Sequence, residues 1–219
     1  MLDSNLLRFN EKQKFLIYDI ESEGLNLQTT RPWQVSFITF DLKNNYEEHD
    51  YFIKWDNLKL SAGAAIATGF NPILYKNKAR DPKEILDIFE SYLNDKQYRI
   101  VFHNGLGFDT MVYNVWRREL ELKTTYDFLY DREFACYDTL ALSKAYKKGF
   151  KPDISNSKAF LAWQYRMLSI RLERGNKTTL GAMGKEFKIN FNESDLHNAL
   201  FDIRLNREVF RQLIWKMDI

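Results

Sequence analysis

The residues of this chain that could do chemistry are four carboxylates and one histidine in three short segments. Asp19 and Glu21 lie in the apolar segment KFLIYDIE, Asp109 ends the glycine-rich segment HNGLGFD, and His197 precedes Asp202 in HNALFD. Carboxylate oxygens are the ligands that Mg²⁺ and Mn²⁺ prefer, whereas Zn²⁺ prefers nitrogen and sulfur. The set predicts two divalent metal ions, Mg²⁺ or Mn²⁺, that promote phosphodiester hydrolysis, with the imidazole removing a proton from water.

The first pair of carboxylates requires a strand. Side chains alternate between the faces of a strand, so Asp19 and Glu21, two residues apart, would lie on one face. Two acids side by side repel each other unless a cation lies between them. The alternative for this pair is a strand end that meets solvent.

His197 and Asp202 require a break in a helix. Apolar residues recur at helical spacing from 195 to 210. Five residues turn a helix by about 500°, so the two side chains would diverge on one continuous helix. We therefore predict that His197 lies on a loop or frayed turn entering the helix, with Asp202 one turn inside. The alternative is a surface histidine and a solvated aspartate.

The segment HNGLGFD has its own alternatives. Asp109 comes where a helix is predicted to begin, and an aspartate there commonly caps the helix. His103 and Asn104 could satisfy backbone groups of the loop.

The elements that must position these residues form an α/β fold. Apolar, β-branched and aromatic runs predict strands at 14–21, 33–42, 46–55 and 98–103, with a short strand edge at the start of CYDTLALSKAY. A turn at Lys43-Asn44-Asn45 and other short connections make the first three an antiparallel meander. Helical spacing and caps predict helices at 81–95, at 108–120, after the strand edge in CYDTLALSKAY, between 157 and 174, and after Asp195. A mixed sheet flanked by helices follows.

The three motifs, in the order DIE, HNGLGFD and HNALFD, resemble those of the DEDDh 3′→5′ exonucleases, and are most similar to the exonuclease I branch of that family. The segments TRPWQVSFITFD, SAGAAIATGFNPILY and VWRREL extend the resemblance over about residues 14 to 214. It implies a ribonuclease H-like fold, an antiparallel meander plus parallel strands. The resemblance also implies the site: a general base, His197, and the metal ligands Asp19, Glu21, Asp109 and Asp202.

The resemblance further implies contacts with the 3′-terminal nucleotide. The residues at the matching positions are Ser22, Leu25, Phe70, His103, Asn104 and Phe108. By residue type alone, Leu25, Phe70 and Phe108 would be expected in the core. The chain departs from the family pattern in having Ser22 where threonine is common, and one extra residue between His103 and Asp109. It also has no counterpart of the C-terminal domains of exonuclease I, so we expect low processivity.

The amino-acid composition limits the kind of protein that this chain can be. The 219 residues are 45% hydrophobic and 28% charged, which predicts one globular domain, an exonuclease domain over 1–219. The single cysteine, Cys136, excludes an internal disulfide. The first residues do not read as a signal peptide and no run is long enough to span a membrane, so we expect a cytoplasmic protein without a membrane partner.

Positive charge gathers in one window. The chain has a net charge of +2, but residues 143–188 hold eleven lysines and arginines against three acids. The alternatives are a solvated helical face and a surface that binds phosphates. Aromatic residues alternate with these charges, as in proteins that stack unpaired bases, so we expect rings such as Trp163 or Tyr165 to stack.

The leading prediction is a 3′→5′ exonuclease on single-stranded DNA that releases nucleoside monophosphates. The sequence leaves open an exoribonuclease, since the choice depends on contacts with the 2′-hydroxyl. A different class, a non-catalytic nucleic-acid-binding or polymerase-docking module, is disfavoured because all five catalytic positions are present. The expected partner is single-stranded nucleic acid, DNA over RNA, and a polymerase partner is left open.

Overall fold

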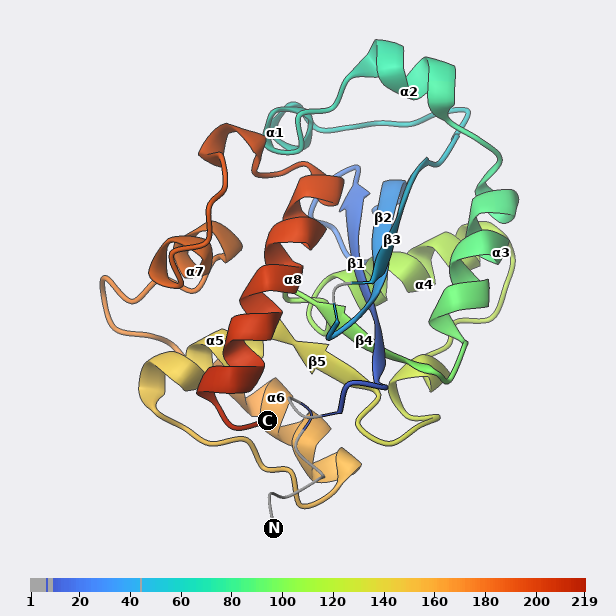
Figure 1. Ribbon diagram of the computed structural model, residues 1–219. Coiled ribbons are helices and arrows are strands. Elements are labelled where there is room, and N and C mark those ends of the chain that lie inside the picture. Colours follow the sequence, from blue (N-terminus) through green and yellow to red (C-terminus); the bar gives the residue numbers. More distant parts are fainter. Residues whose placement is uncertain (1–6, 8–9, 44) are drawn as a thin grey trace.

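A five-stranded mixed sheet forms the centre of the protein (Figure 1), which we describe from a computed structural model for residues 7, 10–43 and 45–219. The strand order is β3-β2-β1-β4-β5. The antiparallel strands β1 to β3 pair in sequence, and β4 and β5 run parallel to β1. The strands are β1 (Lys14–Ser22), β2 (Pro32–Asp41), β3 (Tyr46–Phe52), β4 (Tyr98–Phe102) and β5 (Cys136–Asp138). The predicted α/β class, with an antiparallel meander plus parallel strands, is confirmed.

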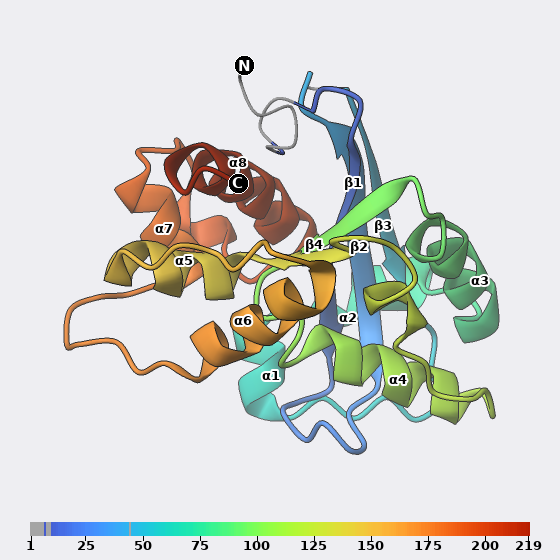
Figure 2. The ribbon, with the colours of Figure 1, turned by 90° about the horizontal axis from the view of Figure 1, so that it is seen from below.

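Helices cover both faces of the sheet (Figure 2). One face carries α3 (Pro82–Leu93) and α4 (Asp109–Glu119). The other carries α5 (Thr139–Lys148) and α8 (Ala199–Lys216), while α7 (Leu180–Glu186) packs against α8, and α6 (Ser157–Ser169) packs against α5 and β5. The helix predicted between 157 and 174 is shorter than expected. It ends at Ser169, because the backbone of Ile170 is extended.

Three short helices, α1, α2 and α7, were not predicted. Of these, α1 (Ala62–Ala67) has the cap Ser61, which accepts a hydrogen bond from the Ala64 N–H, and α2 (Pro72–Lys78) has the cap Asn71. Both lie above the carboxyl end of β1 (Figure 1). These two helices have no buried face of their own, so they leave little apolar periodicity in the sequence.

β2 is an interior strand covered on both faces. Every residue from Pro32 to Phe40 is buried, including the polar residues Gln34, Ser36 and Thr39. The predicted turn between β2 and β3 includes Asn44, which lies outside the described residues. Most of the N-terminal segment that does not read as a signal peptide also lies outside them. Within the described chain, none of the helices has the length and apolar character needed to cross a membrane.

The aromatic residues of α6 have different environments. Trp163 is only 5% exposed and its ring stacks at 5.9 Å on Phe160, so the prediction that Trp163 stacks on bases is wrong. Tyr165, two residues on, is 41% exposed. The helical period decides between them, since residues two apart point to different sides of a helix.

Candidate active site

The carboxyl end of β1 carries the first two carboxylates. Phe15 and Ile17 face the core beneath α8, and period two continues that row to Asp19 and Glu21. β1 pairs with β4 from Lys14 to Ile17. The carboxyl ends of parallel strands are where open α/β sheets hold their sites.

Asp109 approaches the same point from α4. Its side chain is 3% exposed, and Oδ1 accepts a hydrogen bond of 2.9 Å from the N–H of Ile20, between the two β1 acids. The alternative that Asp109 caps its helix is wrong, because Phe108 occupies the cap position and Asp109 is the first helical residue. Its carboxylate thus binds β1 instead.

His197 lies before α8 and Asp202 in its first turn, as predicted, and the contact between them is made by the backbone of His197. Asn198 caps the helix, and His197 lies just outside it with a left-handed φ of 70°. The N–H of His197 donates to Asp202 Oδ2 at 3.1 Å, while its side chain is exposed. Asp202 Oδ1 is buried without a hydrogen-bond partner among the described residues.

The four carboxylates lie close enough to repel one another. Burial raises the pKa of Asp19 well above its usual range, and repulsion from Asp109, Glu21 and Asp202 raises it further. Burial, and then repulsion from Asp202 and Asp109, raises the pKa of Glu21 to about 8. Burial also raises the pKa of Asp109 to about 7 and that of Asp202 to about 6. Carboxylates from three elements therefore share one electrostatic site.

This donor set suits a hard cation. It offers carboxylate oxygens, one of them buried and unpartnered, and a positive ion would remove the repulsion that raises their pKa values. As the side chains of the described residues stand, no group of three or more His, Cys, Asp or Glu is arranged to hold a metal ion. Metal binding would therefore need the carboxylates to move toward one another.

Asp138 is a site residue that the sequence motifs missed. This fully buried carboxylate accepts hydrogen bonds from the N–H groups of Asn104 at 3.0 Å and Leu106 at 3.1 Å. It also caps α5 by accepting from Leu140 and Ala141. It thereby holds the loop that delivers Asp109. An aspartate before a helix start, as in CYDTLAL, indicates the cap, but the bonds to a distant loop leave no local pattern.

Glycine is required within that loop. A Cβ on Gly105 would lie 2.2 Å from the ring of Phe102, and one on Gly107 would lie 2.8 Å from Asn104 Oδ1. Asn104 itself has a left-handed φ of 65°. The tight turn brings α4 directly behind the end of β1.

Two of the residues predicted to touch a terminal nucleotide are in internal hydrogen bonds. Ser22 Oγ donates to the Gly24 carbonyl at 2.9 Å. His103 Nδ1 lies 2.9 Å from Thr139 Oγ1, which lies 2.6 Å from Asn206 Oδ1. Burial lowers the pKa of His103 to about 4, so its ring is neutral at pH 7.

The other four differ in exposure. Leu25 is 87% exposed, whereas Phe70 is partly buried, with its ring edge-to-face at 5.0 Å from Trp33. Phe108 and Asn104 are partly buried beside Asp109. Of the six, Leu25 is thus the most open to a ligand.

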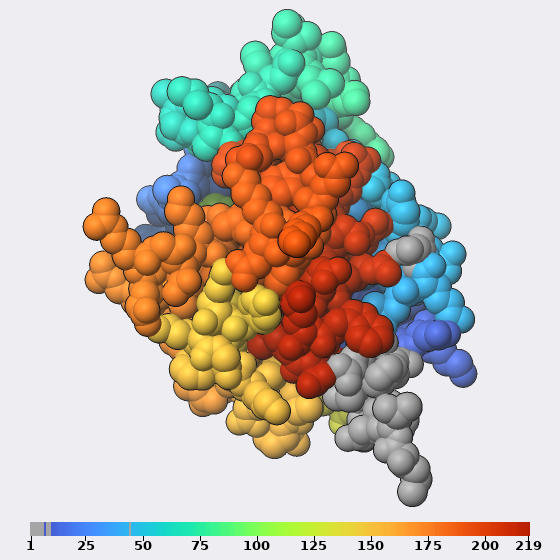
Figure 3. All heavy atoms as spheres, turned by 60° about the vertical axis from the view of Figure 1, so that its left-hand side comes forward, coloured from blue at the N-terminus to red at the C-terminus, as the bar shows by residue number. Residues whose placement is uncertain are grey.

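An ion pair ties together the loops around Leu25. Glu23 and Arg31 pair at 2.6 Å, and the Glu23 carboxylate also accepts from the Lys59 N–H. The N–H of Ser61, the cap of α1, donates to the Glu23 carbonyl at 3.1 Å. The segment between α7 and α8 lies against α1 (Figures 1 and 3), so α1 and the His197 loop border the same site.

Comparisons with known proteins bear on the fold. No protein-family model matches this chain, and neither does any curated protein sequence. The structure of E. coli exonuclease I in complex with a dT13 oligonucleotide matches with a TM-score of 0.71 and 18% identity, over 92% of this chain and 41% of that chain. A product-bound structure of exonuclease I matches with a TM-score of 0.70 and 17% identity, over 94% and 44%.

The chain thus spans less than half the length of the exonuclease I chains that it matches. At this level of identity the likeness establishes the architecture. This protein has the ribonuclease H-like α/β fold seen in the matching part of exonuclease I.

Proposed function

We propose that this protein is a metal-dependent 3′→5′ exonuclease that hydrolyses single-stranded DNA to nucleoside monophosphates. The observation that carries the proposal is the meeting of four carboxylates with raised pKa values at the end of β1, next to an exposed histidine. Support comes from structures of the same fold, since E. coli exonuclease I is known in complexes with dT13 and dA16 oligonucleotides.

Each residue has a role in this proposal. Asp19, Glu21, Asp109 and Asp202 would hold two divalent cations, Mg²⁺ or Mn²⁺, which supply charge stabilisation at the scissile phosphate and a more acidic water. His197 would accept the proton of the attacking water, because its ring is exposed at the mouth of the site. Its own N–H holds Asp202 in place.

One exposed side chain and one partly buried side chain close in sequence to the carboxylates favour recognition of a strand end. Leu25 follows the β1 acids in sequence and is open to solvent, and Phe108 directly precedes Asp109. We propose that these two side chains pack against the terminal nucleotide, with Phe70, Ser22, His103 and Asn104 shaping the pocket behind them.

The test is digestion of 5′-labelled single strands with Mg²⁺, with and without EDTA, and with an RNA strand in parallel. We expect shortening from the 3′ end that EDTA stops. Glu21→Gln and Asp109→Asn should reduce hydrolysis to background, because each removes a ligand charge. The matched control is Asp87→Asn, which changes an exposed carboxylate paired with Lys83 on α3. Shortening from the 5′ end, resistance to EDTA, or full turnover by Glu21→Gln would contradict the proposal.

A further inference from the structure

We propose that Tyr126, Tyr130 and Tyr165, here called the tyrosine patch, hold unpaired bases of the substrate strand where it leads away from the active site. This inference rests on the proposed function and assigns the path of the strand. The occupant is a single DNA strand, with its bases on the rings and its phosphates near cations.

The patch consists of rings that the core does not use. Tyr126 is 38% exposed, Tyr130 62% and Tyr165 41%, although one lies on α6 and two lie in the segment after α4. They lie on neighbouring elements, because Leu161 of α6 shares a core cluster with Phe128 and Leu129 of the segment after α4, and Tyr165 comes one helical turn after Leu161. Burial and then Tyr130 raise the pKa of Tyr165 to about 12. Exposed, adjacent rings offer π-faces on which any base can stack.

The patch continues from the candidate active site. Tyr126 donates its hydroxyl hydrogen to Met111 Sδ at 3.5 Å, and Met111 lies in the first turn of α4, two residues after Asp109. Met111 and Phe108 are both partly exposed. Phe108 and Met111 are three residues apart and share one side of the start of α4, so they link the segment beside Asp109 to Tyr126.

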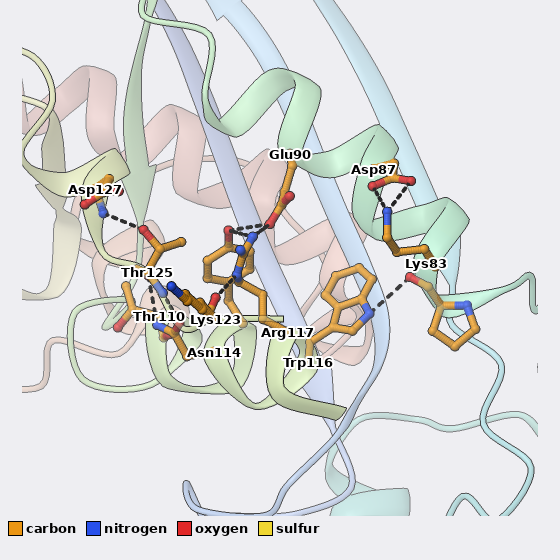
Figure 4. Close-up of polar contacts among 12 residues, drawn as sticks. Lys83, Asp87, Glu90, Thr110, Asn114, Trp116, Arg117, Lys123, Thr125 and Asp127 are labelled. Carbon is orange, nitrogen blue, oxygen red and sulfur yellow. Dashed lines mark hydrogen bonds and ion pairs between the residues drawn. The ribbon is translucent and has the colours of Figure 1, made fainter. Parts of the chain in front are cut away.

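The segment that carries Tyr126 is held firmly against α4 (Figure 4). The N–H of Thr125 donates to Asn114 Oδ1 at 2.7 Å, and Asn114 Nδ2 donates back to the Thr125 carbonyl at 3.1 Å. Arg117 Nε donates to the Lys123 carbonyl at 2.6 Å. A preorganised ring loses little freedom when a base stacks on it, which favours binding.

Charge beside the patch is complementary to a strand. The exposed face of α6 carries Lys158 and Arg166 next to Tyr165, and the projecting segment 170–178 (Figure 2) carries three further exposed cations, Arg171, Arg174 and Lys177. Among the described residues, these five cations form no ion pairs, whereas Lys147 and Lys148 of the same basic window do. Rings for bases beside cations for phosphates are the combination that binds single strands.

The first experiment measures kinetics of the double variant Tyr126→Ala/Tyr165→Ala on a twelve-nucleotide strand and on a dinucleotide. Loss of stacking should raise KM for the longer strand roughly 5- to 100-fold. KM for the dinucleotide and kcat for both should stay at wild-type values. Tyr126→Phe/Tyr165→Phe should restore KM, because phenylalanine retains the ring. Tyr46→Ala is the control, since Tyr46 is 52% exposed on β3.

The second experiment measures strand binding under conditions in which hydrolysis is not expected. Strands with 5-iododeoxyuridine at single positions are irradiated with the wild-type protein in EDTA and the adducts are mapped. Adducts at the patch from interior positions, and not from the 3′-terminal nucleotide, are expected. A wild-type KM in the double variant, or adducts that avoid all three tyrosines, would overturn the inference. Hydrolysis of the dinucleotide in that case would leave the proposed function standing, whereas failure to hydrolyse either substrate would refute the proposed function itself.

Discussion

At the scale of single residues, His197 combines a backbone role and a side-chain role. Its N–H holds Asp202, and its φ of 70° lies in the region that favours glycine and asparagine. Histidine adopts this left-handed region more readily than most residues, and here the conformation leaves the ring exposed at the entrance to α8. This favours a task for the imidazole beyond packing.

We predict that His197→Asn and His197→Gly cut turnover by roughly 10²–10⁴-fold, the usual contribution of a positioned general base. Both substitutions tolerate the left-handed backbone, so the bond to Asp202 should persist and Mn²⁺ affinity should be unchanged. Steady-state kinetics and calorimetric Mn²⁺ titration measure the two quantities. His197→Ala serves for comparison, because alanine there adds backbone strain. If His197→Gly lost Mn²⁺ affinity, the imidazole would be a ligand.

The carboxylates make the stability of the metal-free protein depend on pH. Burial raises the pKa values of Glu21, Asp109 and Asp202 to about 8, 7 and 6, and repulsion from other carboxylates adds to the shifts of Glu21 and Asp109. The folded state therefore binds more protons than the unfolded state above about pH 4, and the free energy of unfolding falls as pH rises toward 8. We expect a lower Tm at pH 8 than at pH 5.5 in EDTA.

Mn²⁺ should raise Tm more at pH 8 than at pH 5.5, because it binds the ionised carboxylates. Glu21→Gln should flatten the pH dependence in EDTA, since it removes the carboxyl group with the highest pKa of the three. Thermal unfolding in the two buffers measures this. A metal-free Tm that rises from pH 5.5 to pH 8 would show that these carboxylates are not repelling one another.

At the scale of elements, one buried carboxylate joins the loop after β4 to the start of α5. The Asp138 carboxylate accepts hydrogen bonds from four backbone N–H groups, two in the loop after β4 and two at the start of α5. Burial raises its pKa to about 6 despite these bonds, so it is mostly ionised at pH 7. The position of Asp109 therefore depends on a residue in another element.

We predict that Asp138→Asn lowers turnover and Mn²⁺ affinity while KM for the strand changes little. An amide has one acceptor oxygen where the carboxylate has two, so some loop N–H groups lose their partner, at about 1–3 kcal/mol each. Asp81→Asn is the matched control: Asp81 caps α3 through Lys83 and Glu84 in the same way. Equal losses of Mn²⁺ affinity in both variants would mean that Asp138 acts only as a cap.

At the scale of the whole molecule, ion pairs decide which cations of the basic window are available. Lys147 pairs with Glu186, Lys148 with Glu173 at 2.9 Å, and Lys185 with Glu193 at 2.7 Å. Reversing the charges of Lys147 and Lys148 would therefore break folded-state contacts as well as any contact with phosphates. The cations of the projecting segment 170–178 are better candidates for binding the strand.

We predict that reversing Arg171, Arg174 and Lys177 to glutamate raises KM for single strands more than it lowers kcat. If each contacts one phosphate, the slope of log K against log salt should fall by about 2. Lys147→Gln/Lys148→Gln is the control and should leave that slope near the wild-type value. Binding titrations between low and moderate salt provide the measurement. An unchanged slope in the triple variant would make this segment a solvated face.

Local patterns in the sequence determined most of the elements and the five candidate catalytic positions. Period two placed Asp19 and Glu21 on one face of a strand, and the spacing of His197 and Asp202 predicted a break before the last helix, as the structure shows. These inferences succeeded because each depends on backbone geometry within a few residues. The role of each position in catalysis remains a prediction.

Tertiary structure alone decided the role of Asp138 and which rings of α6 are exposed, because both depend on contacts between residues distant in sequence. Asp138 became a support of the site only when the loop after β4 folded onto it. The face of α6 that met the core buried Trp163 and left Tyr165 exposed beside the segment after α4. Sequence spacing specifies which side chains share a face, but only long-range packing specifies what that face meets.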